Sequence, residues 1–393
     1  MIDKINLTNH CILINTSDLF YISQQIESIK DINDSIICKI NWNATQLKNN
    51  LNRLIKIFRS ENQFKYNNKQ DLYLIFFEVV NNDLKTLIDH NNVLNASAGL
   101  VQLIDKIKSK FSHDNFCLTT SSLQSNAIKT AFNLNGEIKN ETIIRLKDDL
   151  LGSKSWKSLS FLFDFLNKYS NWLILRNFED LNDSYLFEDG DDIDILCEEI
   201  NFFTALMNAK KRSGERCSYF VTVNNFQIPL DIRFIGDKYY DPVWSKDMLF
   251  RKIVTNGIPT PCISDYFYSL IYHIKLQKNF IKPTYTERLD NLAIKMNFLL
   301  PRHFILDDSI CSRILNSFLN TFNYYYTYTD DAGRNETFLK NINKKEINDL
   351  LSNWRFLLKA SRLTFSKKIK EVFKRNISKL KLNANKTNQI INL

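Results

Sequence analysis

The sequence reads GDDIDIL at residues 190–196, and this stretch predicts the strand from which the rest of the fold is inferred. Asp192 and Asp194 alternate with aliphatic residues, which is the period of a strand that has one face in a core. On such a strand both carboxylates project from one face, while Ile193 and Ile195 point into the protein. Because an ionised carboxylate is costly to bury without a partner, this face is expected to hold a counter-charge.

A second apolar run places one more carboxylate beside this strand. Residues 228–234 read IPLDIRF, so Asp231 lies between two aliphatic residues in a segment of strand character. A neighbouring strand would bring Asp231 to the same face as Asp192 and Asp194. Carboxylates, together with water and phosphate oxygens, are the ligands that Mg²⁺ takes in proteins. We therefore expect these three residues to share one or two Mg²⁺ or Mn²⁺ ions.

The order of the elements around these acids resembles the nucleotidyltransferase superfamily of the DNA polymerase β type. That family has a strand ending in a Gly-Gly or Gly-Ser turn, a loop, an Asp-x-Asp strand and a third Asp on a later strand. Here an apolar run at residues 172–175, then Asp192 and Asp194, and then Asp231 follow one another in the middle of the chain. The chain departs from the family pattern at the turn, where an Arg-Asn pair follows the first strand.

This resemblance implies a metal-dependent enzyme that transfers a nucleotidyl group from a nucleoside triphosphate, such as ATP, to a hydroxyl or phosphate acceptor. Asp192, Asp194 and Asp231 would be its catalytic residues and its metal ligands, with two ions about 4 Å apart that hold the attacking and leaving oxygens. The wider sequence also looks like members of the superfamily that are linked to surface-glycan and glycosyltransferase genes. The first expectation for the acceptor is therefore a glycan or sugar-phosphate precursor in polysaccharide biosynthesis.

Four basic or polar residues are expected to bind the nucleotide. Arg176 and Asn177 form the turn after the first strand, and Arg176 would meet the triphosphate where the family uses backbone groups. Lys275 and Lys278 lie in an expected helix over residues 265–278, and a lysine ammonium is a point charge suited to phosphate. The alternative for that helix is a place in the core, with its one histidine satisfied by hydrogen bonds.

Two other functions fit the same residues. The acceptor could be RNA, in which case a basic segment near the C-terminus would supply electrostatic attraction. The chain could also be a catalytically inactive binding module with a nucleotidyltransferase fold, because its Arg-Asn turn departs from the family. The three intact acids argue against this inactive alternative.

Composition narrows the class of protein. The chain has 393 residues, of which 44% are hydrophobic and 13% aromatic, which is typical of globular domains and leaves room for two or three of them. It has only 8 glycines and neither a GxGxxG nor a GxxxxGK[ST] motif, so the common phosphate-binding loops are excluded. Its 7 cysteines are scattered without a CxxC pair, which argues against a zinc site or a disulfide framework.

We expect an α+β fold in three parts. A nucleotidyltransferase-like mixed sheet with flanking helices would occupy residues 150–245, after a small α/β domain over residues 1–135. A helical region with a basic tail would occupy residues 246–393. Strands are expected in the first part at residues 11–15, 36–40 and 72–79. Helices are expected in the last part at residues 244–253, 265–278, 285–298 and 309–324, before a short strand at 324–329.

The net charge of +9 comes from one segment. Residues 355–386 hold eleven lysines and arginines and a single acid, Glu371, in a pattern typical of a basic amphipathic helix. Such a helix would bind an anionic membrane surface; the alternative is a solvated helix docked by its apolar stripe. The chain shows no signal peptide and no run of 18 apolar residues, so we expect a cytoplasmic protein, peripheral to the inner face of a membrane.

Overall fold

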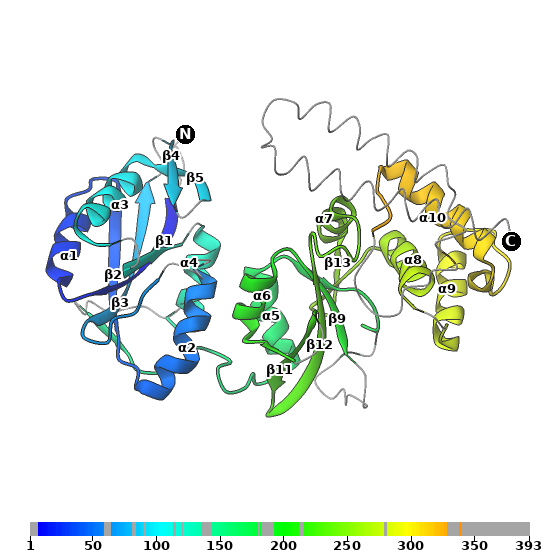
Figure 1. Cartoon of the computed structure of the whole chain (residues 1–393), viewed down its shortest axis with the longest axis horizontal. Helices are drawn as coiled ribbons and strands as arrows, with labels where there is room; N and C mark the ends of the chain where they lie inside the picture. Colours follow the sequence, from blue (N-terminus) through cyan, green and yellow to red (C-terminus); the bar gives the residue numbers. More distant parts are fainter. Residues whose placement is uncertain are drawn as a thin grey trace, which may run out of the picture.

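The computed structural model describes residues 7–327 and Phe338, apart from several short gaps. These gaps cover residues 59–63, 81–83, 90–91, 113–114, 120, 135–142, 180, 182–191, 213–215 and 279–280. The basic segment expected at residues 355–386 lies outside the described residues, and so does most of the loop before the Asp-x-Asp strand. Within the described residues the chain has a mixed α+β fold, as expected (Figure 1).

The first sheet has five strands in the order β6-β1-β3-β2-β7. Its neighbours are antiparallel except for β2 and β7, which run parallel. The bounds are Leu7–Thr16 for β1, Ile32–Ile40 for β2, Asp71–Val80 for β3, Phe116–Leu118 for β6 and Ile144–Leu146 for β7. The three expected strands are present and longer than the apolar runs indicated, whereas the short strands β6 and β7 carry too few residues to show a period.

Both faces of this sheet are covered by helices. Ile12 and Ile14 of β1 pack with α1 (Leu19–Glu27) and α3 (Ala98–Lys110) on one face. Cys11 and Leu13 point to the other face, where α2 (Ala44–Ile57) and α4 (Ser122–Ala131) lie. Asn43 and Ser121 begin these last two helices with capping boxes. The side chain of each accepts a hydrogen bond from the backbone N–H of the glutamine three residues later, and the side-chain oxygen of that glutamine accepts one from the backbone N–H of the capping residue. A separate hairpin joins β4 (Leu84–Asp89) to β5 (Asn92–Ser97).

The second sheet, in the order β10-β11-β12-β9-β8, carries the three acids. Strand β9 runs parallel to β12 and antiparallel to β8, and β11 and β12 form a hairpin. Asn224 and Asn225 both have positive φ angles, 48° and 67°, at the turn of that hairpin, which suits a type I′ connection. The bounds are Trp172–Ile174 for β8, Ile193–Cys197 for β9, Lys210–Lys211 for β10, Ser218–Val223 for β11 and Phe226–Phe234 for β12.

One face of the second sheet packs toward the first. Ile193 and Ile195 lie in a hydrophobic core with α5 (Leu159–Tyr169) and α6 (Ile200–Met207), as the alternating pattern predicted. This core continues through α2 and α4 to the first sheet (Figure 1). Because β9 alternates, Asp194 must face the opposite side of the sheet.

That opposite side is covered by the helical region. Leu173 and Leu196 pack there with Trp244 and Phe267, which come from α7 and α8. The helices are α7 (Pro242–Arg251), α8 (Ile263–Tyr272), α9 (Pro283–Lys295) and α10 (Asp308–Phe322), and β13 (Ile253–Thr255) pairs with β14 (Ile258–Thr260) between the first two.

Two expectations for this region were wrong in detail. The helix expected over residues 265–278 ends as an α-helix at Tyr272 and continues as a π-helix over His273–Gln277. A π-helix changes which residues share a face, so spacing alone misplaces the lysines of that segment. Residues 324–327 are not a strand, and residues 328–329 lie outside the described part.

Arg53 joins α2 to α6 across the core that the two sheets share. Its Nε donates to Ala205 O and its Nη2 to Leu206 O, both at 2.7 Å, so it satisfies the last carbonyls of α6. Its Nη1 donates to Leu151 O at 2.7 Å. Arg53 is only 5% exposed, and burial lowers the pKa of its guanidinium to about 9. The side chain therefore anchors α6, the helix that directly follows β9.

Replacing this guanidinium tests the anchor. Arg53→Met should lower the free energy of unfolding by about 2–4 kcal/mol, because it leaves several buried carbonyls unpaired. Lys48→Met, an exposed change on the same helix, is the control and should stay within about 0.5 kcal/mol of wild type. Urea unfolding midpoints measure both, and equal effects of the two changes would contradict the anchoring role.

Candidate functional site

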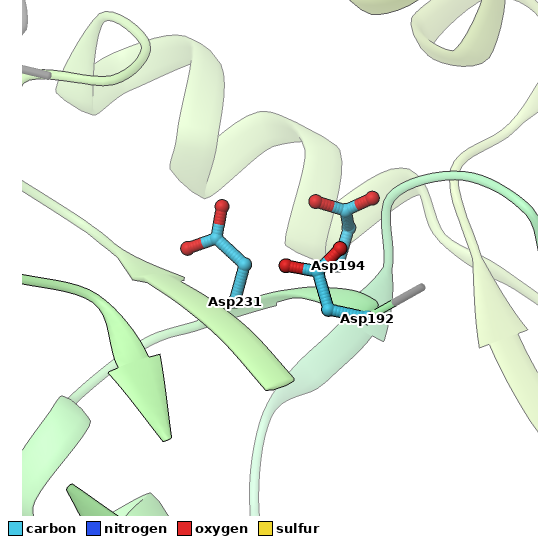
Figure 2. A group of neighbouring side chains, drawn as sticks. All are labelled: Asp192, Asp194 and Asp231. Atoms are coloured by element: carbon cyan, nitrogen blue, oxygen red, sulfur yellow. The ribbon is translucent and has the colours of Figure 1, made fainter. Parts of the chain in front are cut away.

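The structure brings the three predicted acids together. Asp194 on β9 lies opposite Asp231 on β12 in the parallel pairing, and Asp192 precedes Asp194 by two residues. All three carboxylates point to the same side of the sheet (Figure 2). One oxygen from each lies within 4.8 Å of the others. Asp194 is 6% exposed, whereas Asp192 lies at the solvent-exposed end of the group.

Arg176 is the counter-charge of Asp194. Arg176 comes two residues after the end of β8. The residue between them, Leu175, donates its backbone N–H to Asp194 O at 2.8 Å, so the strand pairing sets the side chains of Arg176 and Asp194 beside each other. The Arg176 Nη2 forms a buried ion pair with Asp194 Oδ1 and donates to the Tyr239 hydroxyl at 3.3 Å. Arg176 is 5% exposed and lies among the acids; its predicted contact with a triphosphate stays a prediction.

Arg233 is the counter-charge of Asp231. Its Nη2 lies 2.9 Å and its Nε 3.2 Å from Asp231 Oδ2. The two residues are separated by one position on β12 and therefore share a face. The Arg233 guanidinium also stacks over the Tyr239 ring, with 4.0 Å between its central carbon and the ring centroid. Tyr239 thus contacts both arginines, one through its hydroxyl and one through its ring.

A neutral polar group supports Tyr239 from behind. The Tyr239 hydroxyl lies 2.8 Å from His273 Nδ1, which is also 3.1 Å from Gln277 Oε1. Gln277 closes the group by donating to Tyr239 O at 3.1 Å. Burial, followed by the charge of Arg176, lowers the pKa of His273 well below its usual value, so this ring is neutral. The histidine is a satisfied core residue, as the alternative interpretation of this helix predicted.

The other predicted nucleotide-binding residues are placed differently from one another. Asn177 has a φ of 57°, a left-handed conformation that glycine or asparagine adopts most readily, and its Oδ1 accepts from Arg288 Nη1 at 2.9 Å. Lys275 is buried, and its Nζ pairs with Asp308 at 2.7 Å, so it is committed elsewhere. Lys278 is exposed, and its charge partly opposes the rise that burial and Asp231 cause in the pKa of Asp192, so it acts on the acid group.

Two more acids lie just beyond Asp231, and both belong to turns. Asp241 caps α7 by accepting from Val243 N at 2.8 Å and from Trp244 N at 3.1 Å. Asp237 accepts from Tyr239 N at 2.8 Å with one oxygen. The other oxygen, Oδ2, is buried without a hydrogen-bond partner among the described residues. Burial raises the pKa of Asp237 to about 6.

The electrostatics of the acid group favour a bound cation. Burial is the main cause that raises the pKa of Asp194, and repulsion from Asp192 and Asp231 adds to it against the charge of Arg176. Burial and the nearby Asp231 also raise the pKa of Asp192. Three carboxylates face two guanidiniums, so the fully ionised group carries a net charge of −1. A cation would hold all three carboxylates in their ionised form.

Sequence reasoning missed several residues of this site. Arg233 could have been found, because a residue two positions from Asp231 on a strand shares its face. Tyr239, His273 and Arg288 come from a turn, a π-helix and α9, and no spacing in the sequence links them to β9 or β12.

Comparison with protein-family models, curated proteins and solved structures found no match to this chain. No helix in the described part of the chain has both the length and the apolar character to cross a membrane.

The buried carboxyl of Asp237, which has a hydrogen-bond partner for only one oxygen among the described residues, predicts a pH dependence. Its pKa rises from 3.8 in the unfolded chain to about 6 in the fold, so between these values the folded protein holds a proton that the unfolded chain lacks. Stability should therefore fall as the pH rises, by about 1.4 kcal/mol between pH 5 and pH 8 from this group. Asp237→Asn cannot ionise, so the free energy of unfolding of this variant should lack this pH-dependent contribution. Urea unfolding of both proteins at the two pH values measures the difference, and identical pH profiles would contradict the prediction.

Proposed function

We propose that this chain is a metal-dependent nucleotidyltransferase whose site is formed by Asp192, Asp194 and Asp231. The observation that carries the proposal is the register of β9 and β12, which sets the three carboxylates on one sheet face with ligand oxygens within 4.8 Å. The strand arrangement supports it further, because the Asp-x-Asp strand β9 has a neighbour on both sides and the third acid comes from its parallel neighbour β12. The expected residues thus meet on one face of one sheet.

The residues present fit a Mg²⁺ or Mn²⁺ ion. Ligands on opposite sides of Mg²⁺ lie about 4.2 Å apart, since each bond is about 2.1 Å long. Ligands on neighbouring sides lie about 3 Å apart. Three carboxylate oxygens that lie within 4.8 Å of one another would therefore have to draw closer together, by side-chain rotation, to bind one ion. The donors are all carboxylate oxygens, which are the type these hard cations prefer. Asp192 leaves one side of the group open to solvent for water or phosphate ligands.

Each residue then has a definite role in transfer. A bound ion neutralises charge on the reacting phosphate and lowers the pKa of the acceptor hydroxyl. Asp192, Asp194 and Asp231 hold that charge at one place on a rigid sheet. Lys278, exposed near Asp192, would neutralise the outer phosphates of the nucleoside triphosphate. Asn177 supplies the left-handed turn that a small residue makes in the family, so the strand end keeps its shape.

A glycan or sugar-phosphate precursor is the acceptor that we propose first, and RNA is the alternative. The expected anionic membrane partner rests on residues 355–386 and stays a prediction. Measuring transfer from each labelled nucleoside triphosphate, with Mg²⁺ and a fractionated cell extract, would identify both donor and acceptor. Label in an extractable glycan or lipid fraction supports the first proposal, and label in nuclease-sensitive material supports RNA.

An inactive binding module is the second candidate, and one observation favours it. Arg176 and Arg233 already neutralise two of the three acids, so the fold can hold the group without a metal. Such a protein would bind neither Mn²⁺ nor nucleotide at this site. Failure of Mn²⁺ to bind at millimolar concentration would therefore select the inactive module.

A substitution at Asp192 separates these functions. Asp192→Asn should leave the fold intact, because no hydrogen bond joins the Asp192 carboxylate to another described residue. The change should also remove the repulsion of Asp194 and Asp231 by this carboxylate. It should abolish transfer and the rise in melting temperature that Mg²⁺ with nucleotide gives by mass action. Asp164→Asn, which removes an exposed carboxylate on α5, is the control and should keep both. Unchanged transfer in Asp192→Asn would refute the proposed site.

A further inference from the structure

Arg176 lies where a second cation would have to bind. Its guanidinium pairs with Asp194 Oδ1, and its charge also acts on Asp192. A pair of divalent ions would need these same two carboxylates. Arg233, by contrast, pairs with Asp231 through its Nε and Nη2.

We infer that Arg176 is a built-in cation of the site, so that the protein binds one divalent ion and not two. This ion would be held by Asp192, by Asp231 and by the oxygen of Asp194 that Arg176 does not occupy. The inference rests on the proposed function, since it concerns the same three acids. The inferred site differs from the expected two-ion site in two respects. It takes one ion, and Arg176 pairs with Asp194 and does not bind the triphosphate.

The surroundings of Arg176 make its displacement by a metal unfavourable. The side chain is 5% exposed, so it would have to leave a buried position or stay there without a partner. Its other hydrogen bond goes to the Tyr239 hydroxyl, which is neutral and rests against the neutral His273. No second carboxylate bonds to it among the described residues, so no alternative anion is present to receive it.

The test counts bound ions directly. Mn²⁺ alone is titrated into the full-length protein, free Mn²⁺ is followed by electron paramagnetic resonance, and heat by calorimetry. Wild type should bind one Mn²⁺ per chain, and Asp192→Asn should lose this binding. Arg176→Gln removes the charge but keeps an amide donor for Asp194, and it should bind two Mn²⁺, the first at least tenfold more tightly than wild type does. Arg176→Lys keeps the charge and should bind one.

A matched control separates position from charge. Arg233→Gln removes the other guanidinium, and it should still bind one Mn²⁺ because Arg176 remains in place. Two ions in wild type, or one ion with unchanged affinity in Arg176→Gln, overturn the inference while leaving the proposed function standing. No ion in wild type overturns both. Circular dichroism checks the fold of each variant, and if Arg176→Gln does not fold, the counts in wild type and Arg233→Gln decide: two ions in either overturn the inference.

Discussion

Repulsion among clustered carboxylates, one of them buried, is the constraint on which this structure depends. Two unit charges 4 Å apart interact by about 4 kcal/mol at the effective dielectric of a protein surface, and the repulsion grows with burial. Asp194 is 6% exposed and has Asp231 opposite it in the parallel pairing. Protonation or compensating charge relieves such repulsion, and Arg176, just after β8, and Arg233, on β12, supply the charge. Because β8 ends beside Asp194, the chain that follows it can place Arg176 against this carboxylate.

The compensating charges in turn require a neutral support. Tyr239 contacts both guanidiniums, and a third positive group next to it would repel them. His273 meets this need because burial and the charge of Arg176 keep the ring neutral. Gln277 completes the group through neutral hydrogen bonds to the histidine and to the backbone of Tyr239. The π-helix thus brings His273 and Gln277 into a group that regular helical spacing does not indicate.

Much of the fold and part of the site could be predicted from the sequence. The period of β9 gave the facing of Ile193 and Ile195, because alternation on a strand admits only two arrangements. Long helices and strands were found for the same reason, whereas β6, β7 and the π-helix are too short or too irregular to show a period. The direction of Arg176 was not predictable, since a turn residue can point to solvent or inward. Only the pairing of β8 with β9 decides that it meets Asp194.

The openness of the site to solvent differs between its two sides, and this asymmetry bears on how a substrate would approach. Arg176 and the aromatic core close the side behind Asp194, whereas Asp192 and Lys278 are exposed. A triphosphate is strongly anionic, so it gains from the exposed lysine and from any ion at the acids, while the net charge of −1 of the ion-free group repels it. If the chain has the proposed function, binding of the nucleotide would therefore depend on prior or joint binding of a cation. The charge arrangement that stabilises the metal-free fold would then make the cation the condition for substrate entry.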